Sequence, residues 1–215
     1  ALIEVDSAGQ NRIVIVAGAN GTMDAATVLP DLKDVAAGDI VLLQLEIPLD
    51  AVWEIAAEVH RRGAAVVLDP APAAEIPDGV LPTLEWITPN EHEASIITGI
   101  DTSDEAGLVE ATRRLLKDGA THALVKAGSR GAYLATRDAP EPVLIPGFSV
   151  TVVDTTAAGD SFNGGLAWAL SRGQPPAEAV RTANAVAAIS VTARGAQTAM
   201  PDTGTVERFL SQQNR

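Results

Sequence analysis

The chain has 215 residues, of which 47% are hydrophobic and 20% charged, a balance that is typical of a folded globular protein and excludes wholesale disorder. The formal net charge of −13 argues against nucleic acid or an anionic membrane as a partner, because both require a positive protein surface. The absence of cysteine excludes disulfides, thiolate metal sites and cysteine nucleophiles and fits a cytoplasmic location, and no apolar run approaches the ~20 residues that span a bilayer.

The first third of the chain alternates predicted strands with a predicted helix. Leu2–Val5 and Ile13–Val16 are short β-like runs separated by a polar segment, which predicts a hairpin. Ile40–Leu45 is a continuous apolar run of buried-strand length. Val52–Arg62 carries apolar residues at helical spacing, and Ala65–Leu68 is the next predicted strand.

The alternation continues to the C-terminus. Trp86–Thr88 predicts a short strand before a helix over 90–98, and Ser103 is a suitable N-cap for a helix over 104–117. The remaining predicted strands are Ala123–Lys126, a hairpin of Ala132–Ala135 and Val143–Ile145, and Val150–Val153, and the remaining predicted helices are 161–172, 177–190 and 205–213. Strands that alternate with helices and are continuously apolar predict an α/β layered fold with a mainly parallel sheet, whose ligands bind beyond the carboxyl ends of the strands.

The stretch DTTAAGDSFNGG at residues 154–165 interrupts this apolar pattern with small and polar residues. The amides of Ala157–Asp160 stand at a predicted helix N-terminus, where small side chains let an anion approach the unpaired N–H groups. The Asp160 carboxylate beside them is suited to accept a proton from a hydroxyl during phosphoryl transfer. The alternative is an aspartate N-cap with small residues for tight packing.

Two further junctions carry polar residues. KAGSRG at residues 126–131 follows a predicted strand and is suited to line a phosphate or a nucleotide ring, or else is an ordinary glycine-rich turn; no Walker A pattern occurs in the chain. Asn90 and Glu93 share a face of a predicted helical turn and are suited to position water and Mg²⁺ near phosphates. The same pair also fits an N-cap with its capping-box partner.

Several stretches look like motifs of one known family. DTTAAGDSFNGG looks like its D-T-x-G/A-A-G-D signature, ITPNEHEA like its N-x-x-E motif, and KAGSRGAY like its nucleotide loop. On these residues the chain resembles the ribokinase family, also called the PfkB carbohydrate kinases. QLEIPLD, LDPAPA and VTARGAQTAMP are similar to the ribokinase branch, and the resemblance extends from Ala1 to the C-terminus.

The resemblance implies a three-layer ribokinase-like fold and ATP-dependent phosphorylation of a sugar hydroxymethyl group, with D-ribose giving D-ribose 5-phosphate. It implies Asp160 as the general base and Glu46 as a sugar contact. The implied anion hole is formed by the amides of Ala157, Ala158, Gly159 and Asp160. The implied nucleotide site comprises Asn90 at the phosphates, Asn184 near the adenine, and Lys126, Ala127, Gly128, Ser129, Arg130, Gly131 and Gly159, with Glu93 holding Mg²⁺ through water.

Ribokinase-like proteins also bind a monovalent cation, usually K⁺, beside the anion hole. Asp154 and Thr156 match one side of that site, and oxygen ligands of this kind suit a hard cation. The other side is matched by Ser190, Ala193, Gly195 and Ala199. Three positions depart from the family pattern, since Ala199 stands where a hydroxyl-bearing residue is frequent, Asn184 where histidine is frequent and Lys126 where threonine is frequent.

Compared with the family, the chain lacks roughly the N-terminal third, which carries sugar-binding residues and several strands. Residues 1–18 are then expected to be part of a β-lid hairpin, and residues 19–215 the α/β kinase core. The expected partners are a small-molecule sugar, ATP and a second copy of the chain that docks through the lid. The alternatives are another PfkB sugar or nucleoside kinase, or a non-catalytic fragment that binds nucleotide or sugar.

Overall fold

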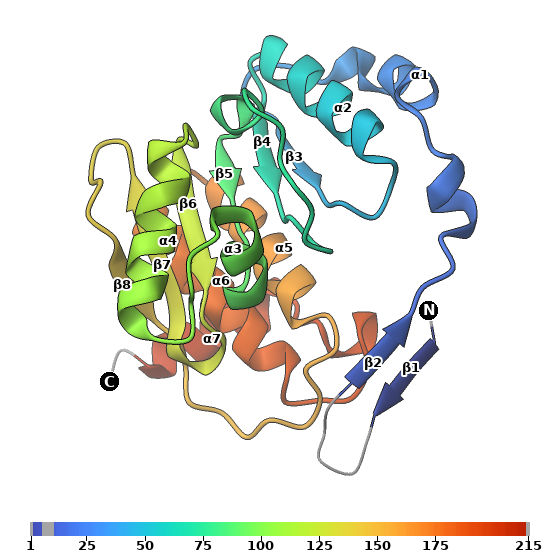
Figure 1. The fold of residues 1–215 in the computed structure, drawn as a ribbon. Coiled ribbons are helices and arrows are strands. Elements are labelled where there is room, and N and C mark those ends of the chain that lie inside the picture. The colour runs from blue at the N-terminus through green and yellow to red at the C-terminus, as the bar shows by residue number, and fades with distance from the viewer. Residues whose placement is uncertain (1, 6–10, 214–215) are drawn as a thin grey trace.

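The computed structural model describes residues 2–5 and 11–213 (Figure 1). β1 (Leu2–Val5) and β2 (Asn11–Val14) form an antiparallel two-stranded ribbon with Ile3 opposite Ile13, and this ribbon lies apart from the main sheet. The second strand begins and ends two residues earlier than predicted, because ladder hydrogen bonds come from the backbone and also include polar residues. The polar turn predicted between the two strands falls on residues 6–10, outside the described residues.

The main sheet has six strands in the order of the chain. They are β3 (Ile40–Leu43), β4 (Ala65–Leu68), β5 (Trp86–Ile87), β6 (His122–Lys126), β7 (Gly131–Thr136) and β8 (Val143–Pro146). β3 to β6 are parallel, with Leu43 opposite Leu68 at the β3–β4 pairing, while β7 and β8 add an antiparallel edge. The predicted mainly parallel α/β sheet is therefore confirmed.

Helices cover both faces of this sheet and make three layers (Figure 1). One face carries α2 (Leu49–Arg61), α3 (Glu91–Thr98) and α4 (Glu105–Lys117), and the other carries α5 (Ala158–Ser171) and α6 (Pro176–Ser190), on which α7 (Thr203–Gln213) packs. The short elements between them are α1 (Ala25–Val28) and the 3₁₀ turns Gly18–Thr22, Leu29–Asp34, Leu81–Thr83, Gly128–Arg130 and Gln197–Ala199. Every predicted helix is present, with bounds shifted by at most three residues.

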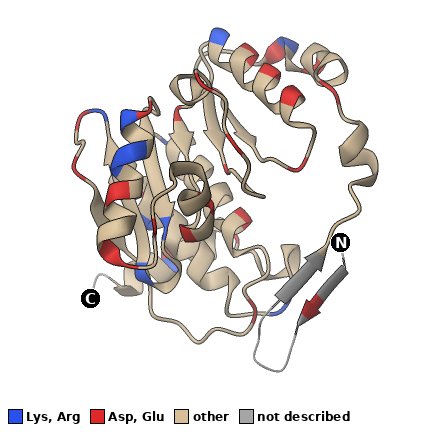
Figure 2. Ribbon diagram, in the orientation of Figure 1, with Lys and Arg blue, Asp and Glu red and all other residues tan. Residues whose placement is uncertain are grey.

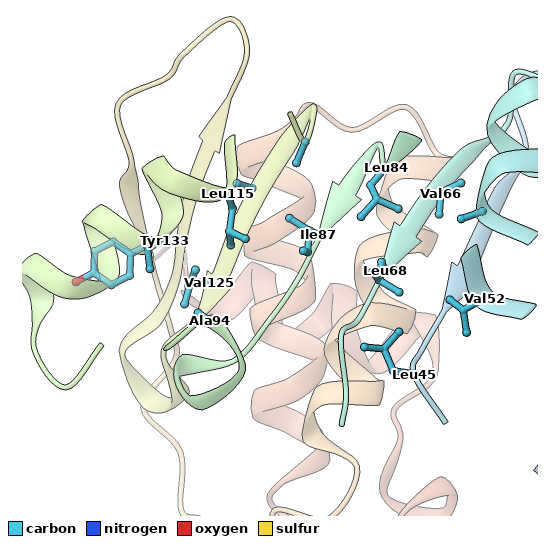
Figure 3. Close-up of a cluster of buried hydrophobic side chains, with 14 of the residues drawn as sticks. Leu45, Val52, Val66, Leu68, Leu84, Ile87, Ala94, Leu115, Val125 and Tyr133 are labelled. Atoms are coloured by element: carbon cyan, nitrogen blue, oxygen red, sulfur yellow. The ribbon is translucent and has the colours of Figure 1, made fainter. Parts of the chain in front are cut away.

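The alternation of side chains along the strands creates one apolar core on each face. Val66 and Leu68 of β4 point toward α2, whereas Val67 between them packs on the α5 side, as the two-residue period of a strand requires. Figure 3 shows the first of these cores, in which Val52 of α2 and Leu115 of α4 lie over the sheet. A sheet that is buried on both faces explains why the strands are continuously apolar.

The predicted strand Val150–Val153 is absent. Val152 and Val153 are 57% and 52% exposed, and the N–H groups of Val153 and Asp154 donate to the carbonyl of Val191 at the end of α6. The segment pairs with no strand in the described part of the chain and is attached to the end of α6 instead. α5 therefore follows an irregular loop.

The N-cap of α4 also differs from the prediction. Asp104, not Ser103, caps this helix, since its carboxylate accepts the N–H of Gly107 at 2.8 Å. Within the described part of the chain, every helix is too short or too polar to cross a membrane. Figure 2 shows that α4 carries several basic residues, in a chain that is richer in acidic residues overall.

Candidate active site

The polar residues at one edge of the sheet define the site. Gln44, Asp69 and Thr88 each follow a strand directly, namely β3, β4 and β5, and Lys126 is the last residue of β6. Because these four strands are parallel, the residues lie at the same edge. The first turn of α5 lies against them, since Gly159 is next to the Lys126 and Asp69 side chains. The site thus stands where ligands bind in parallel α/β sheets.

The backbone at the start of α5 is arranged to receive an anion. Ala157 has φ 57° and ψ 23°, and it is the only non-glycine residue with positive φ in the described ranges. A left-handed residue followed by a helical turn directs successive N–H groups into one concavity. The N–H of Ala158 donates to the Thr155 carbonyl at 3.2 Å, whereas those of Gly159 and Asp160 have no acceptor among the described residues. These two amides therefore remain available to an anion.

Asp160 is exposed on the first turn of α5, beside these amides. Its Oδ1 accepts a hydrogen bond of 2.9 Å from Nε2 of Gln44. Sequence reasoning did not identify Gln44, although a polar residue that closes the apolar run IVLLQL was a usable signal. The structure therefore places beside the anion-binding turn a carboxylate whose orientation is fixed through one oxygen.

A buried polar network joins the sheet edge to α5. Nζ of Lys126 donates to Oδ1 of Asp69 at 2.9 Å, and Oδ2 of Asp69 accepts from Nδ2 of Asn163 at 2.6 Å. Oδ1 of Asn163 in turn accepts from the hydroxyl of Thr88 at 2.9 Å. Sequence reasoning missed Asp69 and Asn163 as site residues. Since Asn163 stands one turn after Asp160 and Gly159, the network fixes the rotation of this helix end.

Asn90 and Glu93 form a complete capping box. The Asn90 side chain accepts from the Glu93 N–H at 2.9 Å, and the Glu93 carboxylate accepts from the N–H and the amide group of Asn90, both at 2.7 Å. Burial is the main influence on the carboxyl of Glu93, and it raises the pKa of that group. The capping alternative for this pair is therefore confirmed, and the contacts to phosphate and Mg²⁺ stay predictions.

A cavity of about 940 Å³ opens between the start of α5, the β6–β7 turn and α6. The predicted site residues that line it are Asn90, Lys126, Gly128, Ser129, Gly131, Ala158, Gly159 and Asn184. Ala127 is buried, Arg130 forms an ion pair with the lining residue Glu91, and Glu46 is exposed in the loop between β3 and α2, outside the cavity lining. The structure thus brings most of the predicted nucleotide residues to one cavity, whereas Ala127, Arg130 and the predicted sugar contact Glu46 do not line it.

One part of the cavity lining combines an aromatic ring with a carboxamide. The ring is that of Phe148, which is held by an edge-on contact with Phe209. Nδ2 of Asn184 donates to the carbonyls of Ile145 and Pro146 at 3.0 and 3.1 Å. These two acceptors consume the amide donors of Asn184, and its Oδ1 has no partner within the described part of the chain.

Three of the predicted cation ligands, Asp154, Thr156 and Gly195, meet at the loop before α5. Oδ2 of Asp154 accepts the N–H of Gly195 at 2.9 Å, and Oδ1 accepts the N–H and hydroxyl of Thr156 at 2.9 and 2.7 Å. These bonds, that of Gly195 first, lower the pKa of Asp154 to about 2. The other predicted ligands, Ser190, Ala193 and Ala199, lie at the end of α6 and in the segment after it. A carboxylate and backbone carbonyl oxygens are the types of ligand that suit a hard monovalent cation.

Acidic and histidine side chains do not otherwise suggest a metal centre. Within residues 2–5 and 11–213, no three His, Cys, Asp or Glu side chains are grouped so that they could hold a metal ion. The polar side chains that line the cavity include one lysine, the carboxamides of Asn90 and Asn184, and the side chains of Glu91 and His92.

The chain is similar to one protein family and to several proteins of known structure. Residues 1–203 match the family model described as pfkB family carbohydrate kinase. A ribokinase of Haemophilus influenzae is 39% identical over 211 residues, which are 98% of this chain and 68% of that protein. The crystal structure of a Thermotoga maritima ribokinase superposes with a TM-score of 0.84 at 41% identity, covering 97% of this chain and 68% of the other. The Arabidopsis thaliana ribokinase complexed with ribose and ATP superposes with a TM-score of 0.85 at 35% identity, covering 97% of this chain and 67% of the other.

Proposed function

The chain belongs to the pfkB family of carbohydrate kinases, and on this basis we propose that it transfers the γ-phosphoryl group of ATP to D-ribose, giving D-ribose 5-phosphate. One observation carries the proposal. The amides of Gly159 and Asp160, after the left-handed residue Ala157, have no acceptor among the described residues, and the Asp160 carboxylate stands directly beside them. An anion-binding turn next to an oriented base is what phosphoryl transfer to an alcohol needs.

The proposed reaction divides between a base and an anion-binding turn. Asp160 accepts the proton of the sugar hydroxymethyl group while that oxygen attacks the γ-phosphorus, and the bond to ADP breaks. The amides at the start of α5 hold the oxygens of the transferring group, on which negative charge is concentrated. Gln44 keeps the carboxylate in place by donating to one of its oxygens.

The proposed ATP site is the cavity lined by the β6–β7 turn and α6. Gly128, Ser129 and Gly131 bring backbone close to the nucleotide, and a side chain at Gly131 would collide with the Ile145 carbonyl. The part of the cavity beside Phe148 receives the adenine, and the phosphates extend toward Gly159. A relative that was solved with ribose and ATP bound supports ATP as the co-substrate.

Two metal ions are part of the proposal. Mg²⁺, which prefers oxygen ligands and retained waters, would be held near the phosphates by Glu93 through water and would offset their charge. K⁺ would be held by Asp154, Thr156 and the carbonyls of the segment 190–199, where it would support the loop that precedes the anion-binding turn. Replacing K⁺ by a bulky organic cation is expected to lower turnover.

The remaining expectations concern assembly and location. We propose that residues 1–18, which include the ribbon β1–β2, are part of a β lid over the sugar, with residues 19–215 as the kinase core, and that two copies of the chain dock through this lid. The separation of the ribbon from the main sheet supports this division. We also propose a cytoplasmic location, because ATP is the co-substrate and the chain has no cysteine.

The choice of sugar is the open part of the proposal. Glu46, the predicted sugar contact, is exposed and outside the cavity lining, and the chain spans about two thirds of the length of the relatives that it matches. Another pfkB-type sugar or nucleoside kinase is therefore the alternative enzyme, and a non-catalytic nucleotide-binding protein is the alternative from another class.

The substitution Asp160→Asn separates the catalytic and non-catalytic alternatives. Loss of the base is expected to lower kcat about 10²- to 10⁴-fold while ATP affinity, measured by calorimetry, changes little. Asp138→Asn, in the exposed turn after β7, is the matched control and is expected to keep full activity. Equal kcat values for Asp160→Asn and Asp138→Asn would contradict the proposal.

A further inference from the structure

Lys126 is one of only three lysines in the sequence, and its side chain is only 13% exposed. It lies at the carboxyl end of β6 and lines the cavity. Its ammonium pairs with Asp69, whose side chain is 6% exposed, at 2.9 Å. A charged pair so deeply buried costs free energy unless its remaining hydrogen-bonding capacity is also satisfied.

Asp69 and Lys126 differ in how much of their hydrogen-bonding capacity is used. Both oxygens of Asp69 accept hydrogen bonds, one from Lys126 and the other from Asn163. The ammonium of Lys126 has three N–H donors, and within the described ranges Asp69 is the only acceptor it contacts. The buried cation therefore has donor capacity left over beside the cavity.

The surroundings of Gly159 show which space the unused N–H donors of Lys126 border. A Cβ atom placed on Gly159 would lie 3.5 Å from Nζ of Lys126 and 4.0 Å from Oδ2 of Asp69. The space beside the Gly159 backbone is therefore bordered by the ammonium. The Gly159 amide itself has no acceptor among the residues described, so one small anion can be reached by a backbone N–H and by the lysine.

We propose that Lys126 is a catalytic residue that donates hydrogen bonds to the non-bridging oxygens of the phosphoryl group being transferred. Asp69 is the positioning residue that holds the ammonium beside Gly159. This inference rests on the proposed kinase function and specifies which phosphate the buried lysine serves. The step balances without proton transfer to or from Lys126: the proton of the sugar hydroxyl goes to Asp160, and the phosphoryl group passes from ATP to the sugar oxygen.

The competing interpretation is a purely structural ion pair between β4 and β6. A structural pair would stabilise the fold and would be indifferent to the number of phosphates on the nucleotide. A lysine that serves the transferring group must distinguish ATP from ADP, because only ATP carries that phosphate.

The test compares ATP and ADP affinities by calorimetry in the absence of sugar, using the 215-residue chain. Lys126→Met is expected to weaken ATP binding roughly 10- to 100-fold and to leave ADP binding within about twofold, because the lost hydrogen bonds are to a charged group. Lys117→Met removes an exposed lysine at the end of α4 and is the control, with no change expected for either nucleotide.

Lys126→Met leaves Asp69 unpaired and can fail to fold, so the double variant Asp69→Asn/Lys126→Met removes both charges. The double variant is expected to show the same selective loss of ATP affinity. Equal changes for ATP and ADP, or no change for either, would overturn the inference. A wild-type chain that binds ATP but phosphorylates no sugar would contradict the proposed function, while the ratio of ATP to ADP affinity would still decide the role of Lys126.

Discussion

Gln44 and Asp160 are 116 positions apart in the sequence, yet Nε2 of Gln44 donates a 2.9 Å hydrogen bond to Oδ1 of Asp160. Gln44 directly follows β3 at the edge of the sheet, and Asp160 lies on the first turn of α5, a helix that covers one face of the sheet. The bond leaves Oδ2 of Asp160 without a partner in the described part of the chain. A carboxylate that is fixed through one oxygen presents the other to a substrate hydroxyl in a defined direction.

Gln44→Ala is expected to lower kcat for sugar phosphorylation about 10-fold, because Asp160 loses the hydrogen bond that orients it. The KM for ATP is expected to stay unchanged, since Gln44 does not line the nucleotide cavity. Gln212→Ala, an exposed glutamine near the end of α7, is the control. Steady-state kinetics measures both parameters, and a Gln44→Ala enzyme with the wild-type kcat would show that the contact has no catalytic role.

Gly159→Ala tests whether an anion must approach the backbone closely at this position. The added Cβ would be 3.5 Å from Nζ of Lys126, an ordinary contact, so we expect the variant to fold and its free energy of unfolding to change by no more than about 1 kcal/mol. The methyl group would occupy the space of the phosphoryl group, and kcat/KM is expected to fall about 100-fold.

Gly164→Ala is the matched control for this glycine. It lies in the same helix and nothing is within 4 Å of the added Cβ, so turnover is expected to be unaffected. Denaturant unfolding and kinetics are measured on both variants. A Gly159→Ala enzyme as active as Gly164→Ala would mean that phosphate does not approach this backbone.

We expect the stability difference between wild type and Asp154→Asn to depend on pH. The Gly195 N–H, followed by the hydroxyl and N–H of Thr156, lowers the pKa of Asp154 from the ordinary value of 3.8 to about 2. A carboxyl whose pKa is lower in the folded than in the unfolded state stabilises the fold above its unfolded pKa, and that contribution is lost as pH falls through the folded value. The difference in Tm between wild type and Asp154→Asn should therefore be largest near pH 6 and shrink between about pH 4 and pH 2. A difference that stays constant down to pH 2 would contradict this assignment.

We expect Asn184 to give the chain a preference for adenine over guanine nucleotides. Its amide donors are taken by Ile145 and Pro146, so only Oδ1 is available to a ligand. Adenine presents an amino donor at position 6 and guanine an acceptor oxygen. We expect kcat/KM for ATP to exceed that for GTP by about 10-fold, and Asn184→Ala to reduce this ratio toward one. Equal use of ATP and GTP by the wild-type chain would refute this role of Asn184.

The sequence predicts well those features that depend on neighbouring residues. Ala65–Leu68 is a strand with the predicted bounds, because an apolar run stands between Gly63, which follows a helix, and the Asp69–Pro70 turn. The capping box of Asn90 and Glu93 was also recognisable, since its partners are three residues apart. Contacts of this range are determined by local geometry.

Features that depend on distant contacts were missed or wrong. Gln44 is recognisable as a site residue only through Asp160, and Asp69 only through Lys126 and Asn163, which are 57 and 94 positions away. Val150–Val153 has the composition of a strand but no partner in the sheet, and only the folded arrangement decides that. The polar residues at the strand ends could therefore be read from the sequence, whereas the hydrogen bonds between residues of different strand ends could not.

The central claim is that this chain phosphorylates D-ribose with ATP. The most direct measurement incubates the purified chain with ATP, Mg²⁺ and K⁺ and with D-ribose, 2-deoxyribose, fructose or inosine in parallel, and identifies the products by ³¹P NMR. We expect D-ribose 5-phosphate and ADP in equal amounts, with the highest kcat/KM for D-ribose, and only a small residual rate of this product from Asp160→Asn. ATP binding without phosphorylation of any of the four acceptors would contradict the claim.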